Sequence, residues 1–214
     1  MHQLLALFPL NTLLFPGEML PLHIFEERYK QMIGRCIERQ EPFGVVLIQA
    51  GEEVGDEAEP FPIGTTAAIE QAMRFEDGRL LIVCRGGVRF RIHEMVHSEE
   101  YLQAAVGFLE DEVTPETQEL AERIRSVYDR YRTAAPIVAA TAAPLEDLPL
   151  DASELSFNLA EQLQVSRYSK QQLLECELET RLEALLAALE EETRMLPPSD
   201  GPPPLRSDVP WSLN

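Results

Sequence analysis

The sequence contains little positive charge compared with negative charge. It has 18 Lys and Arg residues against 37 Asp and Glu residues, which gives a formal net charge of −19 at pH 7. This sign repels phosphate backbones and anionic lipid surfaces. The composition therefore disfavours nucleic acid and membranes as partners.

Cysteine is scarce, and long apolar runs are absent. The three cysteines, Cys36, Cys84 and Cys176, lie far apart and form no CxxC pair, which predicts reduced thiols and not a disulfide framework. No uninterrupted apolar run reaches the length of about 18 residues that suggests a membrane span. The apolar start resembles a signal peptide, but no Lys or Arg precedes it, and Pro9 and Asn11 interrupt it. We therefore expect a cytoplasmic protein.

Catalytic signatures are missing as well. A phosphate-binding loop places a lysine after glycines, and neither lysine follows a glycine. Ser169 and Lys170 are neighbours on an expected helix and do not face each other, whereas Ser169 with Gln172 fits a capping box. His93 and His97 lie in a strand context without a third ligand. We predict no catalytic residue, no metal site and no cofactor.

The first half of the chain has the pattern of short strands. Residues 4–8, 43–48, 65–75, 79–84 and 88–92 are rich in β-branched, aromatic and other apolar residues. Asp77-Gly78 predicts a two-residue type I′ hairpin turn, and residues 85–87 predict a second turn. From residue 88 the alternation predicts a buried face with Val88, Phe90 and Ile92 and a solvent face with Arg89, Arg91 and His93.

Helical periodicity appears once in this half and dominates after Asp111. Residues 26–39 carry an apolar stripe of Tyr29, Met32, Ile33, Cys36 and Ile37. Thr114-Pro115 and Asp151 predict the starts of two further helices, and Ser169 predicts the start of a third that continues to about Leu189. We predict a β-rich part at 1–112, a helical part at 113–195 and a disordered proline-rich tail at 196–214.

The segment "LFPGEMLPLHIFEERY", residues 14–29, combines many apolar side chains with two prolines and a glycine. Pro21 cannot donate to a strand ladder, so it indicates an edge strand, a bulge or a loop. One interpretation places the apolar side chains in the core; the other makes the segment one wall of a binding groove. Similarly, "RGGVRFR" (85–91) indicates either a hairpin turn, which we favour, or an RNA-binding stretch.

Several stretches in order resemble the N-terminal substrate-binding domain of the Lon ATP-dependent proteases. They are "FPLNTLLFPGEMLPLHIFEERYKQMI", "GVVLI", "GTTAAI", "DGRLLIVCRGGVRFRI" and "YSKQQLLECELETRLEALLAALEEE". The resemblance covers about residues 3 to 195. It implies an α+β fold, in which a β-rich, PUA-like pseudo-barrel with one helix precedes a C-terminal helical bundle.

The resemblance implies a role in binding unfolded or tagged polypeptides. It places a groove on Phe15, Pro16, Met19, Leu20, Phe25 and Tyr29. The ATPase and Ser–Lys protease modules of Lon are not matched, so we expect a non-catalytic module that acts as an adaptor or holdase, with a protease or chaperone as its partner. The alternative is a PUA-like protein that binds a small molecule or RNA through Arg85, Arg89 and Arg91.

Overall fold

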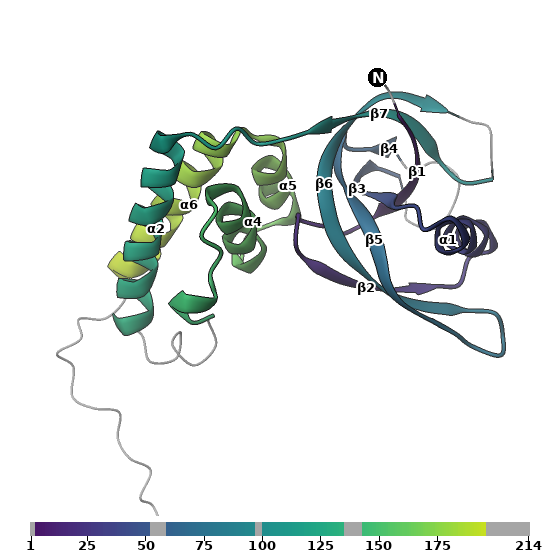
Figure 1. Ribbon diagram of the computed structural model, residues 1–214, viewed down its shortest axis with the longest axis horizontal. Helices are drawn as coiled ribbons and strands as arrows, with labels where there is room; N and C mark the ends of the chain where they lie inside the picture. Colours follow the sequence, from purple (N-terminus) through teal and green to yellow (C-terminus); the bar gives the residue numbers. More distant parts are fainter. Residues whose placement is uncertain (1–2, 52–58, 97–99, 135–142, 196–214) are drawn as a thin grey trace, which may run out of the picture.

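The computed structural model describes residues 3–51, 59–96, 100–134 and 143–195 and shows an α+β fold (Figure 1). The strands are β1 (Gln3–Leu10), β2 (Met19–Ile24), β3 (Phe43–Ala50), β4 (Glu59–Pro60), β5 (Ile63–Arg74), β6 (Leu80–Val96) and β7 (Gln103–Leu109). The helices are α1 (Glu27–Arg39), α2 (Pro115–Ala134), the short 3₁₀ helix η1 (Leu145–Asp147), α4 (Ala152–Gln162), α5 (Arg167–Glu175) and α6 (Leu178–Met195).

The strands form one sheet that returns to its own first strand. They follow the order β1-β7-β6-β5-β3-β4, and β1 also pairs with β3, in parallel. β2 lies off this path and pairs with β6. Figure 1 shows α1 on one side of the sheet and α2, α4, α5 and α6 beyond the opposite side. The predicted division at residue 112 falls between β7 and α2; the division of the chain into two subdomains stays a prediction, and the tail lies outside the described residues.

The helix α1 buries most of its predicted apolar stripe against the sheet. Tyr29, Met32, Ile33 and Cys36 are buried there, and the Tyr29 ring lies 4.2 Å from the ring of Phe8 between centroids. The prediction was wrong for the last residue of the stripe, because the Ile37 side chain is 41% exposed. Ile37 lies in the last turn of the helix, next to Cys36, which is the last buried residue of the stripe.

The strand β6 corrects the prediction of a turn at residues 85–87. Gly86 instead accepts a 2.9 Å hydrogen bond from the Gly17 amide, and a Cβ on Gly86 would lie 2.0 Å from the Phe15 carbonyl oxygen. The glycine therefore permits close approach of the opening loop. Between Gly86 and Arg89 the strand contains a bulge, because three steps on β6 oppose two on β5. At the bulge the prediction was wrong for two residues, because Val88 is exposed and Arg89 is buried. Beyond it, Phe90 is buried, Ile92 is partly buried, and Arg91 and His93 are exposed, as predicted.

The hairpin between β5 and β6 is confirmed, but its turn is longer than predicted. The Phe75 amide donates to the Arg79 carbonyl at 2.9 Å, which leaves three residues in the loop. Gly78 has a φ of 83°, whereas Asp77 is not among the described residues with positive φ. A type I′ turn needs positive φ at both positions, so a three-residue loop that ends in a left-handed glycine replaces it.

The helix starts of the second half follow local capping. The Thr117 amide donates to Thr114 Oγ1 at 3.3 Å, and Asp151 caps α4 through the Glu154 amide at 3.0 Å, both as predicted. The prediction of a single third helix that starts at Ser169 was wrong. Ser166 caps α5, and the helix is interrupted at Cys176, so that α5 and α6 are separate. Arginine side chains bind the carbonyl groups at the end of α5, which stabilises the break.

Candidate functional site

The strand β2 carries the exposed part of the opening segment. Its side chains alternate, so that Met19 and His23 point outward while Leu22 and Ile24 are buried. Met19 is 40% exposed, and Phe25, which follows the strand, is 53% exposed. In the described part of the chain β2 pairs with β6 alone. It is therefore an edge strand, as the position of a proline within it predicts.

The structure does not bring the six predicted groove residues to one surface. Phe15 is 1% exposed, and its ring lies 6.1 Å from that of Phe157 on α4, so it is core. Pro16 lines a separate cleft of about 460 Å³ between the opening loop and α4. Leu20 is half-buried against the sheet core. Met19 and Phe25 thus remain as the well-exposed members of the set.

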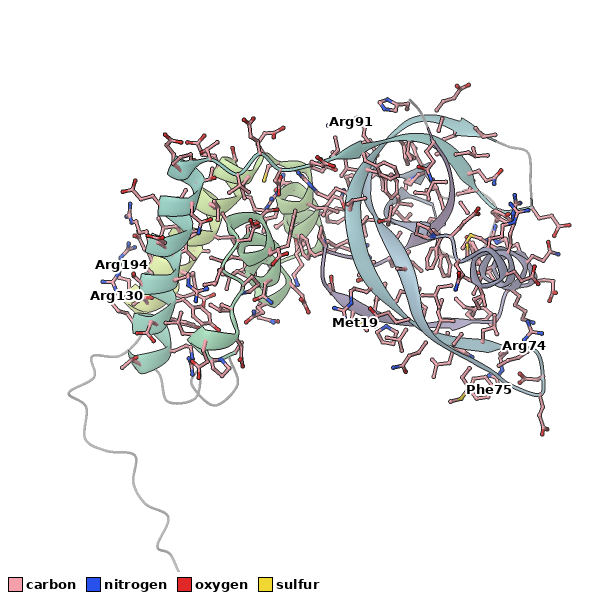
Figure 2. All side chains as sticks on the ribbon, in the orientation of Figure 1. Met19, Arg74, Phe75, Arg91, Arg130 and Arg194 are labelled. Carbon is pink, nitrogen blue, oxygen red and sulfur yellow. The ribbon has the colours of Figure 1, made fainter. Side chains whose placement is uncertain are left out.

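Sequence reasoning missed the neighbours that extend this exposed surface. Leu81 on β6 pairs with His23 on one side and with Met73 on β5 on the other. Leu81 is 38%, Met73 58% and Phe75 39% exposed. We call the surface formed by Met19, His23, Phe25, Met73, Phe75 and Leu81 the apolar face. Figure 2 shows Met19 and Phe75 along the same lower side of the molecule.

A small pocket lies at the free edge of β2, next to the apolar face. Its volume is about 130 Å³, and Phe8, Pro21, Phe25 and Tyr29 are among its lining residues. Tyr29 is 2% exposed, so it belongs to the floor of this pocket and not to an open wall. The pocket and the face together offer a mostly apolar surface with one recess, bordered by Arg85 next to Met19 and by Glu26 at the pocket.

The predicted basic patch is divided between the surface and the interior. Arg85 is exposed and forms an ion pair with Glu70 at 2.5 Å. Arg91 is exposed as well, and Figure 2 shows it on the upper side, away from Met19. Arg89 is 5% exposed, so the expectation that it faces solvent was wrong. These three side chains therefore form no common surface.

Arg89 belongs instead to an ionic cluster that joins the sheet to the helices. Its Nη2 binds Asp111 Oδ1 at 2.5 Å, and the second oxygen of Asp111 binds Arg181 on α6. Ser153 donates to the same carboxylate at 2.6 Å. The Phe157 ring lies 3.9 Å from the Arg181 guanidinium carbon and 5.5 Å from that of Arg89. Burial lowers the pKa of Arg181, and the Asp111 carboxylate opposes that change.

The other reactive groups among the described residues are the cysteine thiols and the side chains that could bind a metal. Cys36, Cys84 and Cys176 are free thiols, and burial raises the pKa of Cys36 to about 11 and that of Cys84 to about 12. Within the described ranges, no group of three or more His, Cys, Asp or Glu side chains could hold a metal ion. No helix in those same ranges is long and apolar enough to cross a bilayer.

The fold of this chain is similar to that of solved Lon N-terminal domains. The crystal structure of a Lon N-terminal domain protein from Xanthomonas campestris is 30% identical, with a TM-score of 0.63 over 86% of this chain and 98% of that chain. The N-terminal domain of Mycobacterium avium complex Lon protease has the same fold, with a TM-score of 0.66 at 20% identity over 88% of this chain and 99% of that chain. Residues 5–191 match the family of the ATP-dependent protease La (LON) substrate-binding domain. The chain therefore belongs to this family.

Full-length relatives extend far beyond the matched region. Lon protease 2 of Myxococcus xanthus is 28% identical over 200 residues, which are 91% of this chain and 24% of the relative. The Lon protease of Anaeromyxobacter dehalogenans is 27% identical over 198 residues, with coverages of 90% and 24%. The chain thus spans about a quarter of the length of these curated relatives.

Proposed function

We propose that the protein is a non-catalytic module that binds unfolded or tagged polypeptides through the apolar face. The observation that carries this proposal is the row of exposed apolar side chains across three strands, in a chain that belongs to a substrate-binding family. Contiguous apolar surface of this kind marks interaction sites in soluble proteins. An adaptor or holdase that serves a protease or chaperone fits this surface.

The geometry suits an extended apolar segment. His23, Leu81 and Met73 form a straight row across β2, β6 and β5, and Phe25 and Phe75 flank its end. A segment that covers this row removes apolar area from water, which contributes about 25 cal/mol per Å². The pocket at the edge of β2 is large enough to accept one apolar side chain. Affinity then depends on apolar content and little on salt.

We expect the scaffold behind the face to have the architecture that the family resemblance implies. The β1–β3 pairing that returns the sheet to its first strand supports a PUA-like pseudo-barrel. The contacts of α2 with α6 and of α4 with α6 support a helical bundle beside it.

Reduced thiols fit a cytoplasmic location. We expect no ATPase and no peptidase activity from this chain.

A single substitution tests the proposal. Met19→Asp places a charge on the apolar face, and we expect it to abolish binding of a permanently unfolded, carboxymethylated probe protein in a fluorescence anisotropy titration. Because Met19 is exposed, the free energy of unfolding changes by only about 0.5 kcal/mol. The matched control is Met195→Asp on α6, where the side chain is 74% exposed and far from the face in sequence. This control retains binding.

The outcome separates the two interpretations of the opening segment. Ile33→Ala, in the core, lowers the free energy of unfolding by about 2–5 kcal/mol. If Met19→Asp unfolds the protein as strongly, the segment is ordinary core. If Met19→Asp binds the probe like the unchanged chain, the apolar face is not the binding surface.

The alternative of a small-molecule or RNA binder has less support. It requires Arg85, Arg89 and Arg91 on one surface, and Arg89 is buried in the ionic cluster. RNA binding weakens steeply as salt rises, because counterions are released from the phosphates. A salt titration of probe binding therefore discriminates between the two functions.

A further inference from the structure

His23 lies at the centre of the apolar face. Its ring centroid is 6.0 Å from that of Phe25 and 6.5 Å from that of Phe75, which it meets edge to face. Leu81 is its direct neighbour across the ladder on β6, and Met73 follows on β5. The imidazole is exposed to solvent and is surrounded on this face by apolar side chains. No other histidine among the described residues lies on the apolar face.

Histidine changes charge between about pH 5 and 8, unlike the other ordinary side chains. A neutral imidazole is an aromatic ring that an apolar segment can cover at small cost. An imidazolium loses its hydration when it is covered, and loss of hydration disfavours the charged form. Covering His23 therefore favours the neutral ring, so binding and protonation oppose each other.

We infer that His23 makes polypeptide capture by the apolar face dependent on pH: the face binds apolar segments while His23 is neutral and releases them when it is protonated. This inference rests on the proposed function of the same face. It identifies His23 as the residue that sets the pH range of binding, a role distinct from that of the apolar anchors around it.

The charged groups around the face do not produce the same pH dependence of binding. On β5 and β6 the nearest charged pair is Arg85 with Glu70 at 2.5 Å, and on the hairpin between these strands it is Arg79 with Asp77 at 2.7 Å. The Arg79 amide and guanidinium lower the pKa of Asp77, so this carboxylate stays ionised throughout the range.

On the α1 side of His23, Glu26 is paired with Arg28 at 3.0 Å and Glu27 with Lys30 at 3.3 Å. Arg74 and Glu76 flank Phe75 on the hairpin and are exposed. Arginine keeps its charge throughout the pH range in which histidine titrates.

Glu18 is the one nearby acid that needs a control. It precedes Met19, it accepts a 2.7 Å hydrogen bond from the Phe15 amide, and burial raises its pKa. The pKa of Glu18 is therefore shifted toward the pH range of the experiment. The variant Glu18→Gln removes this titration and leaves His23 in place.

The experiment measures the affinity of the full chain for a synthetic peptide at about pH 7.5 and about pH 5.5. The peptide contains Leu, Phe, Ser and Gly, has blocked termini and carries a rhodamine dye, so that neither peptide nor dye titrates in this range. We expect the Kd to rise roughly tenfold at the lower pH, as for one proton that must leave on binding. His23→Gln removes the pH dependence, and His23→Arg binds weakly at both pH values.

Controls keep the result specific to His23. Glu18→Gln and His93→Gln, the latter on the part of β6 that pairs with β7, retain the tenfold change. Thermal unfolding of each variant at both pH values, followed by circular dichroism, shows that the fold is intact. Equal Kd values for the unchanged chain at both pH values overturn the inference, and so does a pH dependence that survives in His23→Gln. Absence of binding at pH 7.5 overturns instead the proposed function itself.

Discussion

Asp111 provides the sharpest test of how the sheet is joined to the helices. Its side chain is 3% exposed, and its two arginine partners, Arg89 and Arg181, are 5% and 0% exposed. Asp111→Asn keeps the shape of the side chain and removes its charge. Two buried guanidinium groups then share no counter-charge. Breaking a buried ion pair from one side costs about 3–5 kcal/mol, and we expect the free energy of unfolding to fall by this amount.

Other contacts of the ionic cluster offset only a part of this loss of stability. Arg89 keeps its hydrogen bonds to the carbonyl groups of Leu174 and Cys176, at 2.7 and 3.1 Å. These carbonyls carry only partial charge, so they do not replace the carboxylate. Burial already lowers the pKa of Arg181, and loss of Asp111 removes the main group that opposes this shift. We therefore expect the loss in free energy of unfolding for Asp111→Asn to lie in the upper part of the range of about 3–5 kcal/mol.

The assay is urea unfolding followed by circular dichroism, with an exposed ion pair as the control. Glu190→Gln breaks the Arg123–Glu190 pair, whose side chains are 63% and 40% exposed. Exposed pairs contribute about 0–1 kcal/mol. If Asp111→Asn costs no more than Glu190→Gln, the cluster does not hold the two parts together, and our account of Arg89 is refuted.

Two further predictions concern glycine and cysteine. Gly86→Ala should destabilise the protein by about 1–3 kcal/mol or more, because the new Cβ would lie 2.0 Å from a backbone oxygen of the opening loop. Gly34→Ala in α1 should instead stabilise the protein by about 0.5–1 kcal/mol, because the space around the new Cβ is open. Thermal unfolding of both variants measures the difference. At pH 8 a disulfide reagent should react with Cys36 and Cys84 at least about 100-fold more slowly than with a free thiol, because burial raises their pKa values to about 11 and 12. Rapid reaction of both thiols in a Cys176→Ser background would contradict this.

Features that depend on nearby residues could be predicted from the sequence. Asp151 caps α4, and the Asp77-Gly78 pair forms a hairpin, because each involves groups within a few positions of one another. The buried stripe of α1 was predictable for the same reason, since one helix face meets one surface.

Features that depend on distant strands could not be predicted in this way. The position of Arg89 depends on a bulge opposite β5 and on a carboxylate from Asp111, and neither leaves a local pattern. Met73 and Phe75 alternate with polar neighbours beside the hairpin, a signal that could have indicated an exposed row. Their meeting with β2, however, depends on the pairing of β2 with β6, whose partner residues are about 60 positions apart.

The bulge in β6 has a consequence for how this chain can vary in length. Before the bulge, the alternation of the strand places Leu81 on the apolar face. After the bulge, the alternation places Arg89 in the ionic cluster. Losing one residue at Gly87 or Val88 would turn Arg89 toward water and leave the whole C-terminal half of the strand inverted. Side chains on either half can change separately, whereas an insertion or deletion between them disturbs both at once.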